Sequence, residues 1–570
     1  MDIINYKVIV ISVIITLFIG GCMTEPTDQA SLTTTAARLE QEQQLLDSGI
    51  HVQEEVRQES VVAADAVAPA GARVPQAKSR LMFYEAMPAS SIAQLRAPSE
   101  PLNRENYAHF PDNPLQRVAE APFSTFSIDV DTGAYSNMRR MLNAGNRPVQ
   151  DAIRTEELIN YFSYDYPRPK HRATPFSITT EVGPSPWNPD TQLLHVGIQG
   201  YDVPRAQLPA ANLVFLVDVS GSMQSPDKLA LLKSALRLLV RELQADDRVS
   251  MVVYAGASGV VLEPTAGDQT ATITAALDGL TAGGSTNGGT GIRQAYALAQ
   301  QSFIKDGINR VILATDGDFN VGTVDFEMLK QLVEERREQG IGLTTLGFGR
   351  GNYNDHLMEQ LADAGNGNYA YIDTLSEARK ALVDEMSSTL LTIAKDVKIQ
   401  VEFNPDTVAE YRLIGYENRA LAREDFSNDK VDAGEIGAGH SVTAIYEIAL
   451  TGSAGRRMQG GRYQQKQAAT GNTRELALVK LRYKKPDGES STLIERTVRK
   501  ADIVKDLDQA SAPYRFSAAV AGLGQILRGS KYTGDFSYPE VLALARGARG
   551  DDPFGYRGEF LQLANLASSL

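Results

Sequence analysis

The chain has few of the residues on which catalysis and cross-linking usually depend. It contains one cysteine, Cys22, and six histidines, which form no H-E-x-x-H pair of the kind that binds zinc. A single cysteine has no disulfide partner among these residues, so packing must stabilise the folded parts. Acids and bases are interspersed around a net charge of -14, without a clustered Lys/Arg stripe. These absences argue against an enzyme and against nucleic acid as a partner.

Long apolar runs are also scarce, and the one that stands out lies at the N-terminus. Lys7 precedes the run from Val8 to Gly21, whose length of about 14 residues fits a signal peptide better than a membrane span of about 20. The residues Ile19-Gly20-Gly21-Cys22 resemble a bacterial lipobox, in which small residues precede a cysteine whose sulfur carries diacylglycerol. The alternative interpretation is a short anchor helix with an incidental cysteine.

The lipobox resemblance implies a lipoprotein signal peptide over residues 1–21, lipidation of Cys22 and attachment to a membrane of the bacterial cell envelope. Met23 follows the cysteine in place of an aspartate, and by resemblance to enterobacterial lipoproteins this favours the outer over the inner membrane. Residues 22–104 are rich in Ala, Gln, Glu, Ser and Pro. Such a segment buries little apolar surface, so we expect a disordered, lipid-anchored tether.

Residues 105–204 form an N-terminal flanking region in this interpretation. The pattern predicts short helices over 132–143 and 153–162 and strands over 176–182 and 193–198. Between the tether and the first helix, Asp129-Val-Asp131-Thr-Gly133 resembles a calcium loop, but its glycine comes one position early and no closing glutamate follows. We favour helix capping by Asp131 or Thr132.

Residues 205–390 alternate between buried strands and amphipathic helices. Leu213 to Val217 is a continuous apolar run that ends at Asp218, and Leu229 to Leu243 carries leucines at helical spacing. The alternation continues with strands over 249–254, 311–314 and 341–348 and helices over 292–303 and 328–333. This pattern predicts an α/β fold with a doubly wound, mainly parallel sheet, which binds ligands at the carboxyl ends of its strands.

Residues 391–570 are predicted to form a mainly antiparallel β domain that ends in helices. Alternating apolar and polar residues indicate strands over 397–403, 442–450, 476–483 and 491–498, and the helices fall over 514–526 and 541–545. The segment Gly524 to Lys531 is a distorted phosphate loop with no strand before it, so we do not expect nucleotide binding. Trp187, the only tryptophan, fits packing of the flanking region better than an exposed contact.

Three loops of the central region carry oxygen ligands suited to a hard cation. Asp218-Val-Ser220-Gly-Ser222 places a carboxylate and two hydroxyls on a turn that leaves a buried strand. Thr286 lies in a glycine-rich loop, and Asp316 ends another buried strand before Gly317. Their order in the chain, each at a strand end or a helix start, predicts one divalent-cation site.

At these positions the sequence resembles the von Willebrand factor type A (VWA) domain, a Rossmann-like fold with a metal ion-dependent adhesion site (MIDAS). The family motif has D-x-S-x-S, a threonine in a glycine-rich loop and an aspartate in a T-D-G turn, and all five positions are filled. The resemblance implies that Ser220, Ser222 and Thr286 contact the ion directly, while Asp218 and Asp316 act directly or through water. An open coordination position would take a Glu or Asp carboxylate from a protein partner.

A site with few carboxylates and several hydroxyls favours Mg²⁺, with Mn²⁺ or Ca²⁺ as alternatives. Together, the motifs predict an envelope lipoprotein without catalytic residues that binds a protein partner through this cation. The whole organisation resembles bacterial lipoproteins with a central VWA domain and family-specific flanking regions. The alternative is a non-catalytic VWA subunit or scaffold of a larger enzyme complex, in which the metal is structural.

Overall fold

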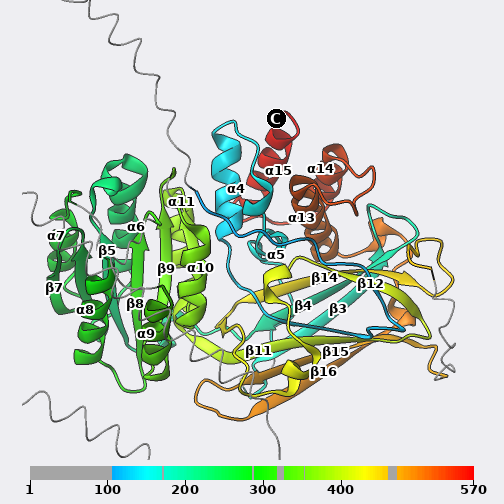
Figure 1. The fold of residues 1–570 in the computed structure, drawn as a ribbon, viewed down its shortest axis with the longest axis horizontal. Coiled ribbons are helices and arrows are strands. Elements are labelled where there is room, and N and C mark those ends of the chain that lie inside the picture. The colour runs from blue at the N-terminus through cyan, green and yellow to red at the C-terminus, as the bar shows by residue number, and fades with distance from the viewer. Residues whose placement is uncertain (1–104, 170–172, 285–287, 318–325, 352, 460–470) are drawn as a thin grey trace, which may run out of the picture. The chain divides into compact units, whose positions relative to one another are not determined.

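The computed structural model describes residues 105–570 apart from 170–172, 285–287, 318–325, 352 and 460–470 (Figure 1). The predicted signal peptide, Cys22 and the predicted tether lie outside the described residues, as does Thr286. All described residues belong to one compact unit, Pro98–Leu570. None of the helices in the described ranges is both long enough and apolar enough to span a bilayer.

The central region contains a six-stranded sheet, parallel except for the edge strand β7, which is antiparallel to β6. In spatial order, its strands are β10 (Tyr369–Ile372), β9 (Gly342–Phe348), β8 (Ile308–Thr315), β5 (Ala211–Asp218), β6 (Arg248–Tyr254) and β7 (Ser258–Ala266). Every residue of β5 and β8 is buried, as expected for strands covered on both faces.

Helices cover both faces of this sheet (Figure 1), which confirms the predicted doubly wound α/β fold. One core joins the sheet to α6 (Leu231–Val240), α7 (Thr270–Asp278) and α11 (Leu375–Arg379). The core on the other face joins it to α8 (Gly288–Gln301), α9 (Phe326–Glu338) and α10 (Asp355–Ala364). In α6 the leucines at helical spacing are the buried ones: Leu232, Leu236 and Leu239.

The flanking regions form two antiparallel sheets packed face to face, which confirms the predicted antiparallel β structure. The first sheet has the order β1 (Gln116–Arg117), β12 (Val408–Ile414), β14 (Ser441–Leu450), β4 (Gln192–Gly200) and β3 (Phe176–Pro184). The second has β13 (Ile436–Gly437), β11 (Thr392–Phe403), β15 (Glu475–Lys484) and β16 (Ser491–Arg499), with β2 (Phe123–Ser127) also beside β11. Val196 and Tyr446 of the first sheet share a core with Val401 and Leu481 of the second.

Five helices pack on the outer face of the first sheet (Figure 1): α4 (Gly133–Asn143), α5 (Thr155–Asn160), α13 (Ala512–Arg528), α14 (Tyr538–Gly547) and α15 (Tyr556–Ala567). Their core includes Leu193 and Ile445 from that sheet. Trp187 belongs to the same core and meets Phe536 edge to face, with ring centroids 6.0 Å apart. The predicted role of Trp187 in packing is therefore confirmed.

The two flanking regions are not the separate domains that the sequence suggests. Strand β4 precedes the central domain in the chain and β14 follows it, yet the two pair along their length. The central domain is thus inserted between strands of one flanking structure. Composition gives no sign of this arrangement, because strand pairing depends on the register of segments far apart in the sequence.

The start of α4 also differs from expectation. Neither Asp131 nor Thr132 caps the helix with its side chain; the amide of Ala134 instead donates to Glu157 Oε2 at 2.7 Å. Asp131 Oδ1 accepts a hydrogen bond from the backbone amide of Tyr369 in β10 at 2.8 Å. The predicted capping is wrong because the Asp131 carboxylate holds α4 against the edge of the central sheet.

A buried arginine strengthens the contact between α4 and the central domain. Arg139 of α4 pairs with Asp373 and, at 2.8 Å, with Glu377 of α11. It also donates to the hydroxyl of Tyr161 at 2.9 Å. Because the Arg139 side chain is only 3% exposed, these bonds are shielded from water and fix the helix beside the sheet.

Candidate metal site

Two of the five predicted ligands lie at the carboxyl ends of adjacent strands. Asp218 is the last residue of β5, and Asp316 directly follows β8. The two strands pair in parallel up to Val217 and Ala314, so both carboxylates reach the same edge of the sheet. Each is fully buried, which is costly for a charge without compensation.

The turn after β5 brings the two serines to the same place. The Ser220 amide donates to Asp218 Oδ1 at 2.8 Å, and Ser220 Oγ lies 2.9 Å from Ser222 Oγ. Asp218 Oδ2 accepts a hydrogen bond from Thr315 Oγ1 at 2.9 Å. These bonds fix the carboxylate of Asp218 beside the pair of hydroxyls. Ser220 is buried, whereas Ser222 is half-buried and accessible from the surface.

The glycine-rich loop is bonded to this turn. The amide of Gly283 donates to the carbonyl of Val219 at 2.8 Å, and the amide of Gly221 donates to the carbonyl of Gly284 at 3.0 Å. The segment just before Thr286 is therefore anchored beside the serines. Thr286 itself falls outside the described residues, so its part in the site stays a prediction.

The T-D-G turn needs its glycine. Gly317 has a φ of +84°, and a Cβ at this position would lie 2.4 Å from the backbone nitrogen of Asn354. Both the left-handed backbone and the close approach exclude a larger residue. The glycine thus allows the chain to turn sharply directly after Asp316.

Sequence reasoning missed one residue at this site. Lys228 Nζ lies 2.8 Å from Asp316 Oδ2, and both side chains are buried. Lys228 belongs to a helical turn, Pro226–Ala230, where its backbone has the non-helical angles φ -117° and ψ -107°. In the sequence it looks like an ordinary solvated lysine at a helix start, and only the fold reveals its contact.

Burial changes the acidity of the first aspartate. Loss of hydration raises the pKa of Asp218 to about 6, and the nearby charge of Asp316 acts in the same direction. Hydrogen bonds from Ser220 and Thr315 oppose the shift. A cation beside Asp218 would replace part of the lost hydration.

The donor set fits a small hard cation. Within the described ranges no three or more His, Cys, Asp or Glu residues gather in a group that could hold a metal, so binding here would depend on the hydroxyls as well as on Asp218 and Asp316. Carboxylates and hydroxyls in small number suit Mg²⁺, which retains several waters. Asp129 and Asp131 likewise belong to no such group within the described ranges.

Three family models match the chain. Residues 212–385 match the von Willebrand factor type A domain, residues 101–195 match a model described as von Willebrand factor, and residues 388–570 match "Uncharacterized protein YfbK, C-terminal". The match to the VWA model agrees with the resemblance seen in the D-x-S-x-S and T-D-G motifs.

Similar proteins include "Uncharacterized protein YfbK" of Escherichia coli, 48% identical over 472 residues that cover 81% of each chain. "Uncharacterized protein sll0103" of Synechocystis is 31% identical over 189 residues, which cover 32% of this chain and 43% of that protein. A solved structure, von Willebrand factor type A from Catenulispora acidiphila, is 16% identical and covers 68% of this chain and 89% of its own, with a TM-score of 0.36.

The identity to the Escherichia coli protein extends through the central domain into the flanking structure, since it covers four fifths of both chains. The chain therefore belongs to the YfbK family, and residues 212–385 are its VWA domain.

Proposed function

We propose that this chain is a lipoprotein of the bacterial cell envelope that binds a protein partner through a divalent cation. The cation would be held by Asp218, Ser220, Ser222, Thr286 and Asp316, and a Glu or Asp of the partner would complete its coordination. The observation that carries the proposal is that two buried carboxylates and two hydrogen-bonded hydroxyls lie at one edge of the sheet. The chain supplies no catalytic group in this function.

The accessibility of the site favours a cation that binds a partner over a cation with a purely structural role. Asp218, Ser220 and Asp316 are buried, but Ser222 is half-buried and faces a surface cavity. A cation bound beside Ser222 would therefore be within reach of a side chain from outside. Mg²⁺ is the expected ion, and Mn²⁺ or Ca²⁺ are the alternatives.

Attachment to the membrane is the second part of the proposal. Lipidation of Cys22 would place the folded residues outside the cytoplasm at the end of a long tether, with the outer membrane favoured. A Cys22→Ser variant should lose metabolic labelling with a radioactive fatty acid and leave the membrane fraction. Labelling that persists in this variant would contradict lipidation at Cys22.

Calorimetric titration of the full chain, purified in detergent, tests the metal site. We expect Mg²⁺ to release heat and to raise the unfolding temperature, because a ligand that binds only the native state stabilises it. The Ser222→Ala variant should lose most of both effects, and Asp218→Ala should lose them entirely. Ser234→Ala is the matched control, since the Ser234 hydroxyl donates to the carbonyl of Ala230, just before α6, and to no residue of the site.

The alternative, a scaffold with a structural metal, predicts a different result in a second measurement. If a partner captured from envelope extracts binds the Ser222→Ala variant as well as the parent, although Mg²⁺ binding is lost, the metal does not mediate adhesion. Equal Mg²⁺ binding by the parent and Asp218→Ala would contradict the site itself.

A further inference from the structure

A cavity of about 820 Å³ lies directly beside the candidate metal site. Ser222 forms part of its wall, together with the turn that follows it in the VWA domain. The opposite wall comes from α4 and the residues after it, so the VWA domain and the flanking structure build the cavity together. Its volume is within the range of sites that enclose small ligands, which is large enough for a few side chains of a partner.

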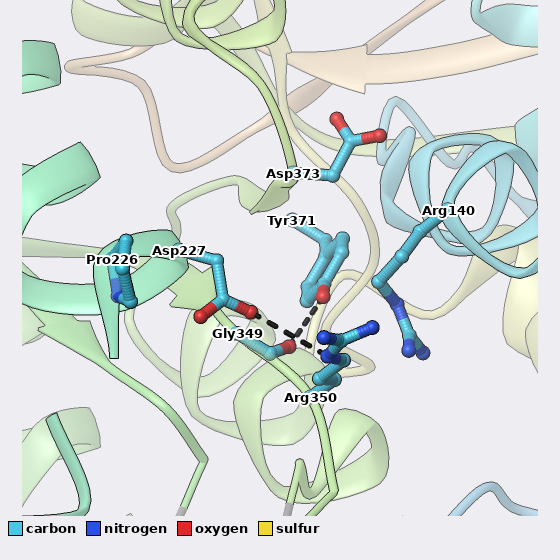
Figure 2. A pocket seen from close by; sticks show the side chains of 7 residues that line it. All are labelled: Arg140, Pro226, Asp227, Gly349, Arg350, Tyr371 and Asp373. Atoms are coloured by element: carbon cyan, nitrogen blue, oxygen red, sulfur yellow. Dashed lines mark hydrogen bonds and ion pairs between the residues drawn. The ribbon is translucent and has the colours of Figure 1, made fainter. Parts of the chain in front are cut away.

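A smaller hollow of about 380 Å³ shares Arg140, Pro226, Asp227 and Arg350 with this cavity (Figure 2). Tyr371 lies between Asp227 and Arg140 in Figure 2, and its hydroxyl is bonded to the carbonyl of Gly349. The recess therefore continues from the larger cavity past Gly349, in the loop after β9, to Tyr371 and Asp373 at the end of β10.

The walls of the larger cavity are basic, although the chain as a whole is strongly acidic. The net charge of the chain is -14. The cavity is nevertheless lined by four basic and two acidic side chains: Arg140, Arg147, Lys228, Arg350, Glu105 and Asp227. A local excess of positive charge in a concave surface concentrates anionic groups.

Two of these arginines have guanidinium N–H groups that a ligand can reach. The Arg350 side chain is 70% exposed, and its ion pair with Asp227 is long, at 4.0 Å. Arg147 is exposed and forms no ion pair with any residue that the structure describes. Arg140 and Lys228, by contrast, are engaged with Glu105 and Asp316. Arg350 and Arg147 are therefore the groups that can bind a carboxylate in bidentate geometry.

The cavity wall is held in place before any ligand arrives. Glu105 Oε1 accepts a hydrogen bond from the Gly351 amide at 2.9 Å, and its Oε2 pairs with Arg140 at 2.9 Å. Glu105 thus connects the loop that carries Arg350 to α4. Preformed walls reduce the entropy that binding must overcome. Val149, 49% exposed, adds an apolar contact at the rim.

We propose that this cavity binds an acidic segment of the partner, with carboxylates on Arg350 and Arg147 beside the carboxylate that completes the metal site. The proposal rests on the proposed function and specifies its partner: a peptide segment that carries several Asp or Glu residues. Glu105 and Asp227 interrupt the basic wall. They repel a dense array of phosphates more strongly than single carboxylates, so a protein carboxylate fits the cavity better than a phosphate-rich surface.

Selection from a random peptide library on the immobilised full chain in Mg²⁺ tests the proposal. We expect the selected pool to be enriched in Asp and Glu. Peptides from this pool should bind about tenfold more weakly to Arg350→Gln and to Arg147→Gln, because each variant removes a charged hydrogen bond. Arg379→Gln is the matched control: its side chain is 67% exposed and pairs with Asp384 at 3.7 Å, and it is absent from the cavity wall.

Three outcomes would overturn the proposal: a pool without acidic enrichment, equal affinity for Arg350→Gln and parent, or Arg350-dependent binding to phosphatidylglycerol vesicles instead of peptides. Calorimetry separates this failure from failure of the metal site. If the parent binds Mg²⁺ but selects no acidic peptides, only the proposal for the cavity fails. If acidic peptides bind through Arg350 but the parent does not bind Mg²⁺, the proposal for the cavity stands and the proposed metal site fails.

Discussion

Lys228 Nζ lies 2.8 Å from Asp316 Oδ2, so a lysine of the chain itself compensates one carboxylate of the candidate metal site. Neither side chain has appreciable contact with solvent. The ammonium therefore stabilises Asp316 at a place where an isolated negative charge would be unfavourable. A divalent cation that binds nearby also experiences the positive charge of Lys228, and the two cations repel each other.

Replacing this lysine should lower the stability of the metal-free protein and raise its affinity for Mg²⁺. We expect Lys228→Met to lower the stability of the metal-free protein by about 3–5 kcal/mol, because it removes the ammonium that compensates the buried charge of Asp316. Mg²⁺ should bind more tightly to the variant and recover part of this loss. Calorimetry with and without Mg²⁺ measures both effects.

Lys233→Met is the control for this experiment, since Lys233 bonds to the carbonyls of Asp278 and Leu280 and to neither carboxylate of the site. An Mg²⁺ affinity that is unchanged in Lys228→Met would show that the lysine and the ion do not interact.

The stem of Lys228 lies against Gly349, which predicts a steric effect. Gly349 has a φ of +74°, and a Cβ there would approach Lys228 Cε to 2.3 Å. Gly351 has a φ of +95° with open space around it. Both Gly→Ala variants carry backbone strain, but only Gly349→Ala displaces the lysine. We expect chemical denaturation to find Gly349→Ala about 2 kcal/mol less stable than Gly351→Ala; equal stabilities would contradict the contact.

Much of the VWA domain follows from local sequence patterns. The apolar runs of β5 and β8 and the leucine spacing of α6 identify their elements because burial on two faces, or on one helix stripe, leaves a clear periodicity. Strand β7 was missed because most of its residues are only partly buried, and β10 because it has only 4 residues. Short or exposed strands leave too few apolar positions to show a period.

The candidate site also contains some residues that the sequence predicts and others that only the fold reveals. Asp218, Ser220 and Ser222 are close in sequence and Asp316 directly follows a neighbouring strand, so the rule for strand ends is enough to group them. Lys228 and the wall formed by α4 could not be predicted. Their positions depend on tertiary contacts such as Asp131 to the Tyr369 amide, which no spacing in the sequence encodes.

The buried ion pairs of Arg139 should matter far more than pairs on the surface. Arg139→Met would leave Asp373 and Glu377 without their partner, and we expect a loss of about 3–5 kcal/mol. Arg168→Met is the matched control, since Arg168 and Asp202 are 69% and 42% exposed, and its cost should be under about 1 kcal/mol. Urea denaturation of the two variants measures the difference. Similar losses would mean that Arg139 is not shielded from water.

A buried histidine of β4 should make stability depend on pH. His195 lies in the interior, and its Nε2 is 3.0 Å from the hydroxyl of Tyr166. Burial lowers the pKa of His195 to about 4, from an ordinary value of 6.5. Between these two values the unfolded chain binds the proton and the folded chain does not, so this histidine reduces stability as pH falls through that window. The full effect is on the order of 3 kcal/mol.

A His195→Gln variant separates this effect from the other titrating groups. Glutamine offers a hydrogen-bonding side chain of similar size but takes up no proton. The variant should lose less stability than the parent between about pH 6.5 and 4, and the two should run parallel above about pH 7. Urea denaturation at a series of pH values measures both curves. Parallel curves over the acidic window as well would mean that His195 is protonated in the folded protein and that the interior of the first sheet accommodates its charge.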